Sequence, residues 1–192
     1  MTRSALERAL PVETATEPLV AWRAWALSGR RDGSHLLLRP VVGRGRPWLP
    51  GRPAEANCRM LGPFHEAPQL ACTCGLHGTY DLDLLRRTRC PAVIGRVALW
   101  GRVIEHELGY RARYGYPQRV RLICQFCFWQ WGSHGAAPDV VGWFPRDELV
   151  PLCWAHLEQA QRYGMEPRRL LPAGEIDLRV RETYAVDPLV RW

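Results

Sequence analysis

The sequence of 192 residues predicts an α+β fold in which a small twisted antiparallel sheet or partial barrel forms most of the structure. Three observations lead to this prediction. Bulky apolar and polar residues alternate between residues 92 and 124, as in half-buried strands. Glycines interrupt this alternation at points where strands can bend or turn. Two clusters of cysteine and histidine flank the alternating region, and a segment of helical composition contains the end of the second cluster.

Composition divides the chain into three parts. Residues 1–17 mix charged residues, proline and threonine without sustained periodicity, so we expect a short helix or a loose N-terminal segment. Residues 18–121 are predicted to form a β-rich module that contains the first cysteine cluster. Residues 122–192 are predicted to form a second module with the other cluster and a C-terminal strand. A chain of this length can bury a core as one ordinary domain or as two small ones.

The β-rich module begins with a predicted hairpin. Residues 19–27 and 35–42 have strand composition, and a turn containing Asp-Gly separates them. The next segment, 43–56, is rich in Gly, Pro and Arg and is expected to be an irregular surface loop. A short helix is predicted within 79–88, where acids come early and arginines late. Two or three antiparallel strands then fill residues 92–124.

The second module is predicted from different signals. Residues 128–147 are rich in Gly, Pro and Trp and indicate a loop or hairpin. Residues 147–164 are predicted to start and form a helix that Gly164 and the following proline end. The alternating sequence of residues 175–184, EIDLRVRETY, predicts a strand.

The N-terminus carries acidic residues and has no apolar stretch of signal-peptide length, so we expect a cytoplasmic protein. Nothing in the sequence approaches 18 uninterrupted apolar residues, and no membrane span is predicted. In a reducing compartment, seven cysteines are more typical of metal ligands or free thiols than of disulfides.

The second cysteine cluster has the spacing of a zinc site. Cys124-x2-Cys127 can turn the backbone so that two thiolates converge on one tetrahedral ion. Cys153 and His156 are three residues apart, which places them on one face of a helix start. The four residues are therefore predicted to bind one zinc ion. The alternative is that the cysteines are free thiols packed among aromatic side chains.

The first cluster has a less regular spacing, Cys58-x6-His65-x6-Cys72-x-Cys74. In an extended segment, residues i and i+2 project to one side, so the last two cysteines can reach the same ion. These four residues are predicted to bind a second zinc ion, with His77 as an alternative ligand. A redox-active Cys-x-Cys pair and ordinary core cysteines are the other interpretations. An iron–sulfur cluster also suits thiolates, but a histidine in each set favours zinc.

The basic composition raises the question of nucleic-acid binding. The formal net charge is +7, and all 26 basic residues are arginine, which excludes P-loop and Schiff-base chemistry because both need lysine. Arginine interleaved with aromatic residues can contact phosphates and stack on bases. The alternative is that these arginines lie on solvated faces and the tryptophans in a small core. The predicted nucleic-acid contacts are Arg44, Arg46, Trp48, Arg52, Arg111, Arg113, Tyr114, Arg119 and Arg121.

The sequences LICQFC at 122–127 and DELVPLCWAHLE at 147–158 resemble the treble-clef zinc finger, in particular the zinc-binding frame of HNH-type nucleases. The resemblance covers residues 122–163 and implies zinc at the second cluster, with a knuckle, a hairpin and a helix around it. HNH nucleases also need an Asp-His pair and an asparagine between the ligand pairs. Here His134 has no preceding acid, and the only asparagine is Asn57.

The first half, with CRMLGPFHEAPQLACTCGLHG followed by VIGRVALWGRVIEHELGYRARYGYP, resembles stretches of small uncharacterised bacterial proteins with zinc knuckles. That resemblance implies a recurrent module and no activity. Closed four-ligand zinc sites hold loops together and leave no position for a reactive water. The sequence therefore favours a non-enzymatic, zinc-stabilised protein that contacts nucleic acid or a nucleic-acid-associated partner. The alternatives are a divergent HNH-like nuclease that uses His134 and a protein-interaction adaptor.

Overall fold

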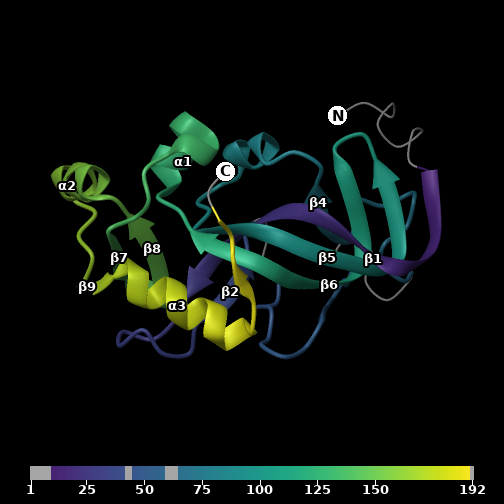
Figure 1. The fold of residues 1–192 in the computed structure, drawn as a ribbon, viewed down its shortest axis with the longest axis horizontal. Coiled ribbons are helices and arrows are strands. Elements are labelled where there is room, and N and C mark those ends of the chain that lie inside the picture. Colours follow the sequence, from purple (N-terminus) through teal and green to yellow (C-terminus); the bar gives the residue numbers. More distant parts are fainter. Residues whose placement is uncertain (1–9, 42–44, 59–64, 191–192) are drawn as a thin grey trace.

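The structure is a computed structural model, and it describes residues 10–41, 45–58 and 65–190. Three long strands run side by side through the middle of the molecule: β1 (Leu10–Ser28), β5 (Val93–His106) and β6 (Gly109–Leu122) (Figure 1). Helix and strand are both well represented, which confirms the mixture of helix and sheet in the predicted fold.

The shorter elements complete the chain. The remaining strands are β2 (Leu37–Pro40), β3 (Ala54–Glu55), β4 (Leu76–Thr79), β7 (Val140–Phe144), β8 (Glu148–Leu152), β9 (Arg169–Pro172) and β10 (Asp187–Pro188). The α-helices are α1 (Gln125–Trp131), α2 (Trp154–Arg162) and α3 (Ala173–Tyr184). Short 3-10 helices are η3 (Asp83–Arg87), η4 (Gly132–His134) and η5 (Pro145–Asp147). Within the described residues, no helix has both the length and the apolar character needed to cross a bilayer.

The strands form one sheet that curls back on itself. Strand β5 pairs with both β1 and β6, and β4 pairs with β6 and, through Trp22 and Thr79, with β1. These four strands make a ring, although not a clear barrel. Strand β8 extends the sheet from β1 to β7 and β9, and among the described strands only β10 is parallel to its neighbour. The predicted hairpin of β1 and β2 and the predicted strands at 92–124 are confirmed.

Hydrophobic residues bury both faces of this sheet. On one face, side chains such as Trp25 and Val93 pack with Val180 and Tyr184 of α3. Because side chains alternate along a strand, Trp22 and Ile94 project to the opposite face. There they form a second cluster with residues of η3 and α1. Helix α3 therefore covers one face, and η3 and α1 cover part of the other.

The predicted strand at 175–184 is wrong, because this segment belongs to helix α3. Its apolar residues alternate in sequence, yet those that are buried, Ile176, Val180 and Tyr184, recur every four residues. Leu178, which completes the alternation, is exposed. The spacing of the buried residues is that of one helix face, and packing against the sheet overrides the local alternation.

Two other boundaries differ from the prediction. The helix expected over 147–164 begins only at Trp154, and Glu148–Leu152 forms strand β8, whose Pro151 would disrupt a helix interior. The loose segment expected over 1–17 becomes strand from Leu10, because the long strand β5 provides a partner for it. Residues 1–9 lie outside the described residues.

Candidate metal centres

The second cysteine cluster is assembled at the starts of two helices. Cys124 is the N-cap of α1, and Cys127 lies in the first turn of that helix. Cys153 is the N-cap of α2, and His156 lies in its first turn. The backbone N–H of Phe128 donates to the Cys124 carbonyl at 2.9 Å, which closes the first turn of α1. The i, i+3 spacing of each pair therefore directs both of its side chains to the same side.

The four donor atoms of this group lie within 4.8 Å of one another. The Cys127 and Cys153 sulfurs are 3.6 Å apart, and His156 Nδ1 lies 3.1 to 3.6 Å from the three sulfurs. A tetrahedral zinc shell has edges of about 3.8 Å between sulfurs and about 3.6 Å between sulfur and nitrogen. A disulfide would need about 2.05 Å, and all described cysteines are free. The donor set and its spacing fit one tetrahedral ion.

The protein interior surrounds this group closely. All three cysteines are buried and cluster with Val140, Leu152 and Leu157. The Phe126 ring stacks on the His156 ring, with centroids 5.1 Å apart, and so helps to orient the imidazole. A Cβ atom at Gly135 would lie 2.7 Å from the Cys127 carbonyl oxygen, so only glycine allows the loop after α1 to approach the site.

Burial raises the pKa of the Cys127 thiol to about 12. Burial also raises the pKa of Cys124, although backbone N–H groups of Cys127 and Cys153 act in the opposite direction. Without an ion these thiols are neutral at pH 7, and a bound divalent cation has to displace their protons.

Asp139 connects the elements that form this site. Its carboxylate accepts a hydrogen bond at 2.9 Å from the backbone N–H of Trp154, which satisfies a free donor at the start of α2. Its backbone N–H donates to Leu152, and its carbonyl accepts from Ala173 at the start of α3. One residue therefore fixes the hairpin of β7 and β8 against two helices.

The first cluster is assembled from loops. Cys58 follows β3, whereas Cys72 and Cys74 precede β4, and His65 lies between them in the chain. The Cys58 and Cys72 sulfurs are 3.7 Å apart, and His65 Nε2 is 3.2 Å from the Cys74 sulfur. All four donor atoms again lie within 4.8 Å of one another. Cys72 is buried and the other three ligands are half-buried, so this group is also able to hold one ion.

Arg111 of β6 organises the backbone of this first group. Its Nη1 atom donates to the carbonyl oxygens of Gln69 at 3.3 Å and Cys74 at 3.2 Å, and also to that of Cys72. Burial lowers the pKa of Arg111, whereas the thiols of Cys74 and Cys72 raise it. A Zn²⁺ ion held by three thiolates and one neutral imidazole carries a net negative charge, which this guanidinium would offset.

Gly75 and His77 follow the last cysteine of the first group in the chain. A Cβ atom at Gly75, which has φ +130°, would lie 3.0 Å from the Arg111 Cβ, so glycine permits the turn after Cys74. His77, the alternative ligand in the sequence prediction, is not part of the group. Its Nε2 donates instead to the Thr73 carbonyl at 3.0 Å.

Two of the described residues that were predicted to contact nucleic acid are buried. Trp48 is only 2% exposed and packs edge-on against Trp25, and Arg111 is only 6% exposed, so the prediction that either meets a partner at the surface is wrong. Arg113 is ion-paired with Glu55 and Glu66. Tyr114 and Arg121 are half-buried. The exposed members of the set are Arg46, Arg52 and Arg119, and Arg44 lies outside the described residues.

His134, the residue on which the nuclease alternative depends, is exposed in η4. It belongs to neither candidate metal group in the described part of the chain. Sequence reasoning did not single out Arg96 of β5 or Trp129 and Trp131 of α1. The fold brings these two elements together, because Ile94 of β5 and Phe128 of α1 belong to one hydrophobic cluster. The sequence signal for the tryptophans was their position in FWQW directly after the Cys-x2-Cys knuckle.

No protein-family model matches the chain, and no curated protein or solved structure matches it at a significant level.

Proposed function

We propose that the chain is a zinc-stabilised binding protein, that its two ions fix loops and helix starts to the sheet, and that its partner is a nucleic acid. The observation that carries the metal proposal is the convergence of four thiol and imidazole donors within 4.8 Å in each of two separate groups. Three sulfurs and one imidazole nitrogen suit zinc better than the hard oxygen-seeking cations.

Each zinc ion is proposed to act as a structural cross-link. Four protein ligands complete a tetrahedral shell and leave no position for a reactive water. At the second group, the order of knuckle, hairpin and helix along residues 124–162 supports a treble-clef arrangement. The ion there would join α1 to α2, and the ion at the first group would hold the loop before β4 to the end of β3.

The charge of the chain supports nucleic acid as the partner class. The formal net charge is +7, and exposed arginines include Arg46, Arg52 and Arg119. Neutralising phosphates with arginine releases condensed counterions, which gives such binding a strong dependence on salt.

The experiment is a fluorescence anisotropy titration of labelled DNA and RNA oligonucleotides, single-stranded and duplex, at about 50 mM and about 200 mM salt. We expect binding at low salt that weakens steeply at high salt. The absence of binding to every oligonucleotide at low salt would exclude nucleic acid as the partner while leaving the metal proposal intact.

A further inference from the structure

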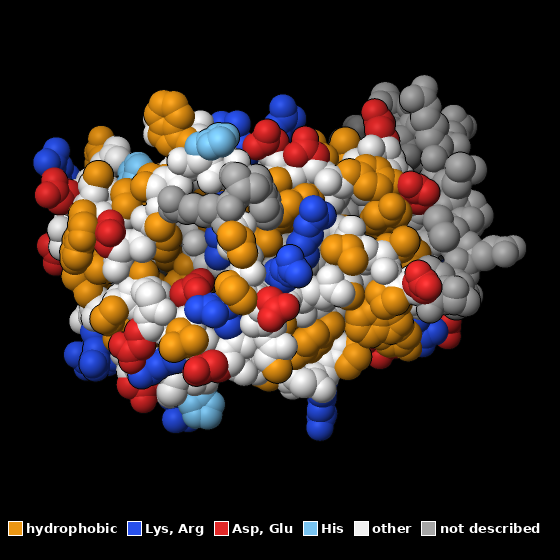
Figure 2. Space-filling view, viewed as in Figure 1, with side chains coloured by type: hydrophobic (Ala, Val, Ile, Leu, Met, Phe, Trp, Pro, Cys, Tyr) orange, Lys and Arg blue, Asp and Glu red, His pale blue; other side chains and the backbone are white. Residues whose placement is uncertain are grey.

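Three arginines lie on one face of the sheet, near the start of β5 and the end of β6. The strand register pairs Arg96 with Arg119 and Ile94 with Arg121. Directly paired residues project to the same face, so all three arginines share the face of the sheet that η3 and α1 partly cover. Figure 2 shows basic side chains near the centre of the face in view, over these strands, with acidic side chains beside them.

This row of arginines concentrates positive charge. In the described part of the chain, neither Arg96 nor Arg119 forms an ion pair within 4.0 Å, although Asp187 of β10 is the register partner of Arg119. Burial lowers the pKa of Arg96, and the charge of Arg119 lowers it further. Like charges directly opposite on neighbouring strands are destabilising, and a bound anion would remove that cost. The Arg96 guanidinium lies 3.8 Å from the ring centroid of Trp22, which fixes its position.

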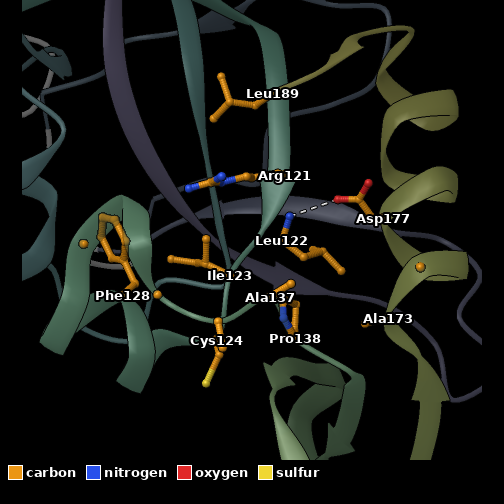
Figure 3. A pocket seen from close by; sticks show the side chains of 14 residues that line it. Arg121, Leu122, Ile123, Cys124, Phe128, Ala137, Pro138, Ala173, Asp177 and Leu189 are labelled. Atoms are coloured by element: carbon orange, nitrogen blue, oxygen red, sulfur yellow. Dashed lines mark hydrogen bonds between the residues drawn. The ribbon is translucent and has the colours of Figure 1, made fainter. Parts of the chain in front are cut away.

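A cavity of about 270 Å³ adjoins this row. Figure 3 shows Arg121 extending between Leu189 on one side and Ile123 and Phe128 on the other. Small and apolar residues of the loop after α1 and of the start of α3 form most of the remaining wall. The volume is below that of most sites for drug-sized ligands, which begin at about 300 Å³. It suits one flat, mostly apolar group beside a cation, such as a nucleobase.

Two exposed tryptophans of α1 shortly precede, in the chain, a residue that lines the cavity. Gly132 lines the cavity and directly follows Trp131, which is 62% exposed, and Trp129 is 66% exposed. Arg86 donates from Nε and Nη2 to the Trp129 carbonyl at 3.0 and 2.8 Å and from Nη2 to the Gln130 carbonyl at 2.7 Å. These bonds hold the last turn of α1, so the backbone that carries both indole rings is fixed before any partner binds.

We propose that single-stranded nucleic acid binds across this surface, with backbone phosphates at Arg96 and Arg119, one unpaired base in the cavity beside Arg121, and further unpaired bases stacked on Trp129 and Trp131. Tryptophan faces stack on bases of any sequence once those bases are unpaired. Residues 125–138, which include both tryptophans, contain no acidic residue, and the acidic groups nearest the surface are Asp177 at the cavity wall and Asp187 beside Arg119. The inference rests on the proposed function and assigns it a site that differs from the one predicted from sequence.

The test uses the full-length protein and labelled oligo-dT, oligo-U and duplex DNA in anisotropy titrations. Trp129→Ala and Trp131→Ala should each weaken binding of the single strands by about fivefold or more. Arg119→Glu should weaken binding and reduce the slope of affinity against salt by about one unit or more. Duplex DNA should bind more weakly than either single strand, and the comparison of oligo-dT with oligo-U decides between DNA and RNA.

Matched controls come from the same chain. Trp154→Ala removes an exposed tryptophan of α2, and the pair Arg46→Ala and Arg52→Ala removes exposed arginines of the sequence-predicted set. None of these should change affinity beyond about twofold, as surface changes away from an interface have small effects. Every variant should retain the metal content of the wild type, which shows that it is folded.

The outcomes separate this inference from the proposed function. If the wild type binds with strong salt dependence but only the control arginines matter, the surface proposed here is wrong and the function stands. If the wild type binds no nucleic acid at low salt, both fail, and the tryptophan surface would be left to a protein partner. Arg96→Ala is avoided as the main test because it also removes packing on Trp22.

Discussion

The two candidate metal groups present the same donors, three thiols and one imidazole, but the chain supports them differently. In the second group, each ligand pair occupies the first turn of a helix, and all three cysteines are buried. In the first group, the ligands come from loops around β3 and β4, and three of the four are half-buried. The difference indicates that donor chemistry determines which ion fits, whereas the surrounding elements determine how firmly the site is held.

Hydrogen bonds from Arg111 hold the first group in place, whereas helices hold the second group. The second group gains its geometry from backbone hydrogen bonds inside α1 and α2 and from Asp139. The first group has no helix, and a guanidinium from the neighbouring strand β6 holds three carbonyl oxygens of its loop instead. Buried carbonyl groups need such partners because leaving them unpaired destabilises the folded state.

The largest effect is expected from Cys127→Ser, which should remove one zinc ion and unfold the module around α1 and α2. Zinc binding contributes on the order of 10 kcal/mol to the folding of zinc-finger peptides. Cys72→Ser should lower the melting temperature less, because the long sheet does not depend on the loop before β4. Differential scanning calorimetry measures both, with the exposed Cys90→Ser as the control. A larger loss for Cys72→Ser would reverse the ranking of the two sites.

Arg111→Leu should come second, with a loss of about 3 kcal/mol in the free energy of unfolding, since it removes the charged donor of three carbonyl groups. The matched control is Arg113→Leu on the same strand, whose exposed ion pairs should contribute about 0.5 kcal/mol. Urea denaturation measures both values. Equal effects of the two substitutions would show that the Arg111 hydrogen bonds do not hold the first group.

Chelation should distinguish the sites kinetically. The half-buried ligands of the first group are more accessible, so a colorimetric chelator should remove that ion about tenfold faster, a difference of about 1.4 kcal/mol in activation free energy. The phases can be assigned with Cys127→Ser, which should lack the slow phase, and Cys72→Ser, which should lack the fast one. A single phase in the wild type would mean that burial does not control release.

The smallest effect concerns the choice between two histidines. His77→Ala should leave the metal content unchanged because His77 bonds to the Thr73 carbonyl and lies outside the group. His65→Ala should weaken or abolish binding of one ion, since the His65 Nε2 atom lies 3.2 Å from the Cys74 sulfur. Loss of an ion in His77→Ala but not in His65→Ala would exchange their roles.

Local spacing made both cysteine groups predictable. Cys-x2-Cys at a helix start and Cys-x-Cys in an extended segment each direct two thiols to one side without help from the rest of the fold. The hairpin of β5 and β6 was predictable for a similar reason, because its alternation and its glycines are local signals.

The rest depends on contacts between distant segments. The role of Arg111 follows from the pairing of β6 with β4, which places residue 111 beside residues 69–74. Trp48 is buried because the first hairpin brings it against Trp25, and no local sequence pattern predicts that contact. Helix α3 was predicted as a strand because Leu178 completes an apolar alternation that the tertiary contacts do not use. The arginine row likewise depends on the register between Arg96 and Arg119.

The most direct measurement of the central claim is the elemental content of protein purified without added metal, by mass spectrometry. The account predicts two equivalents of zinc in the wild type and one equivalent in each of Cys72→Ser and Cys127→Ser. A fully folded wild-type protein that contains no metal would contradict it, as would iron in place of zinc.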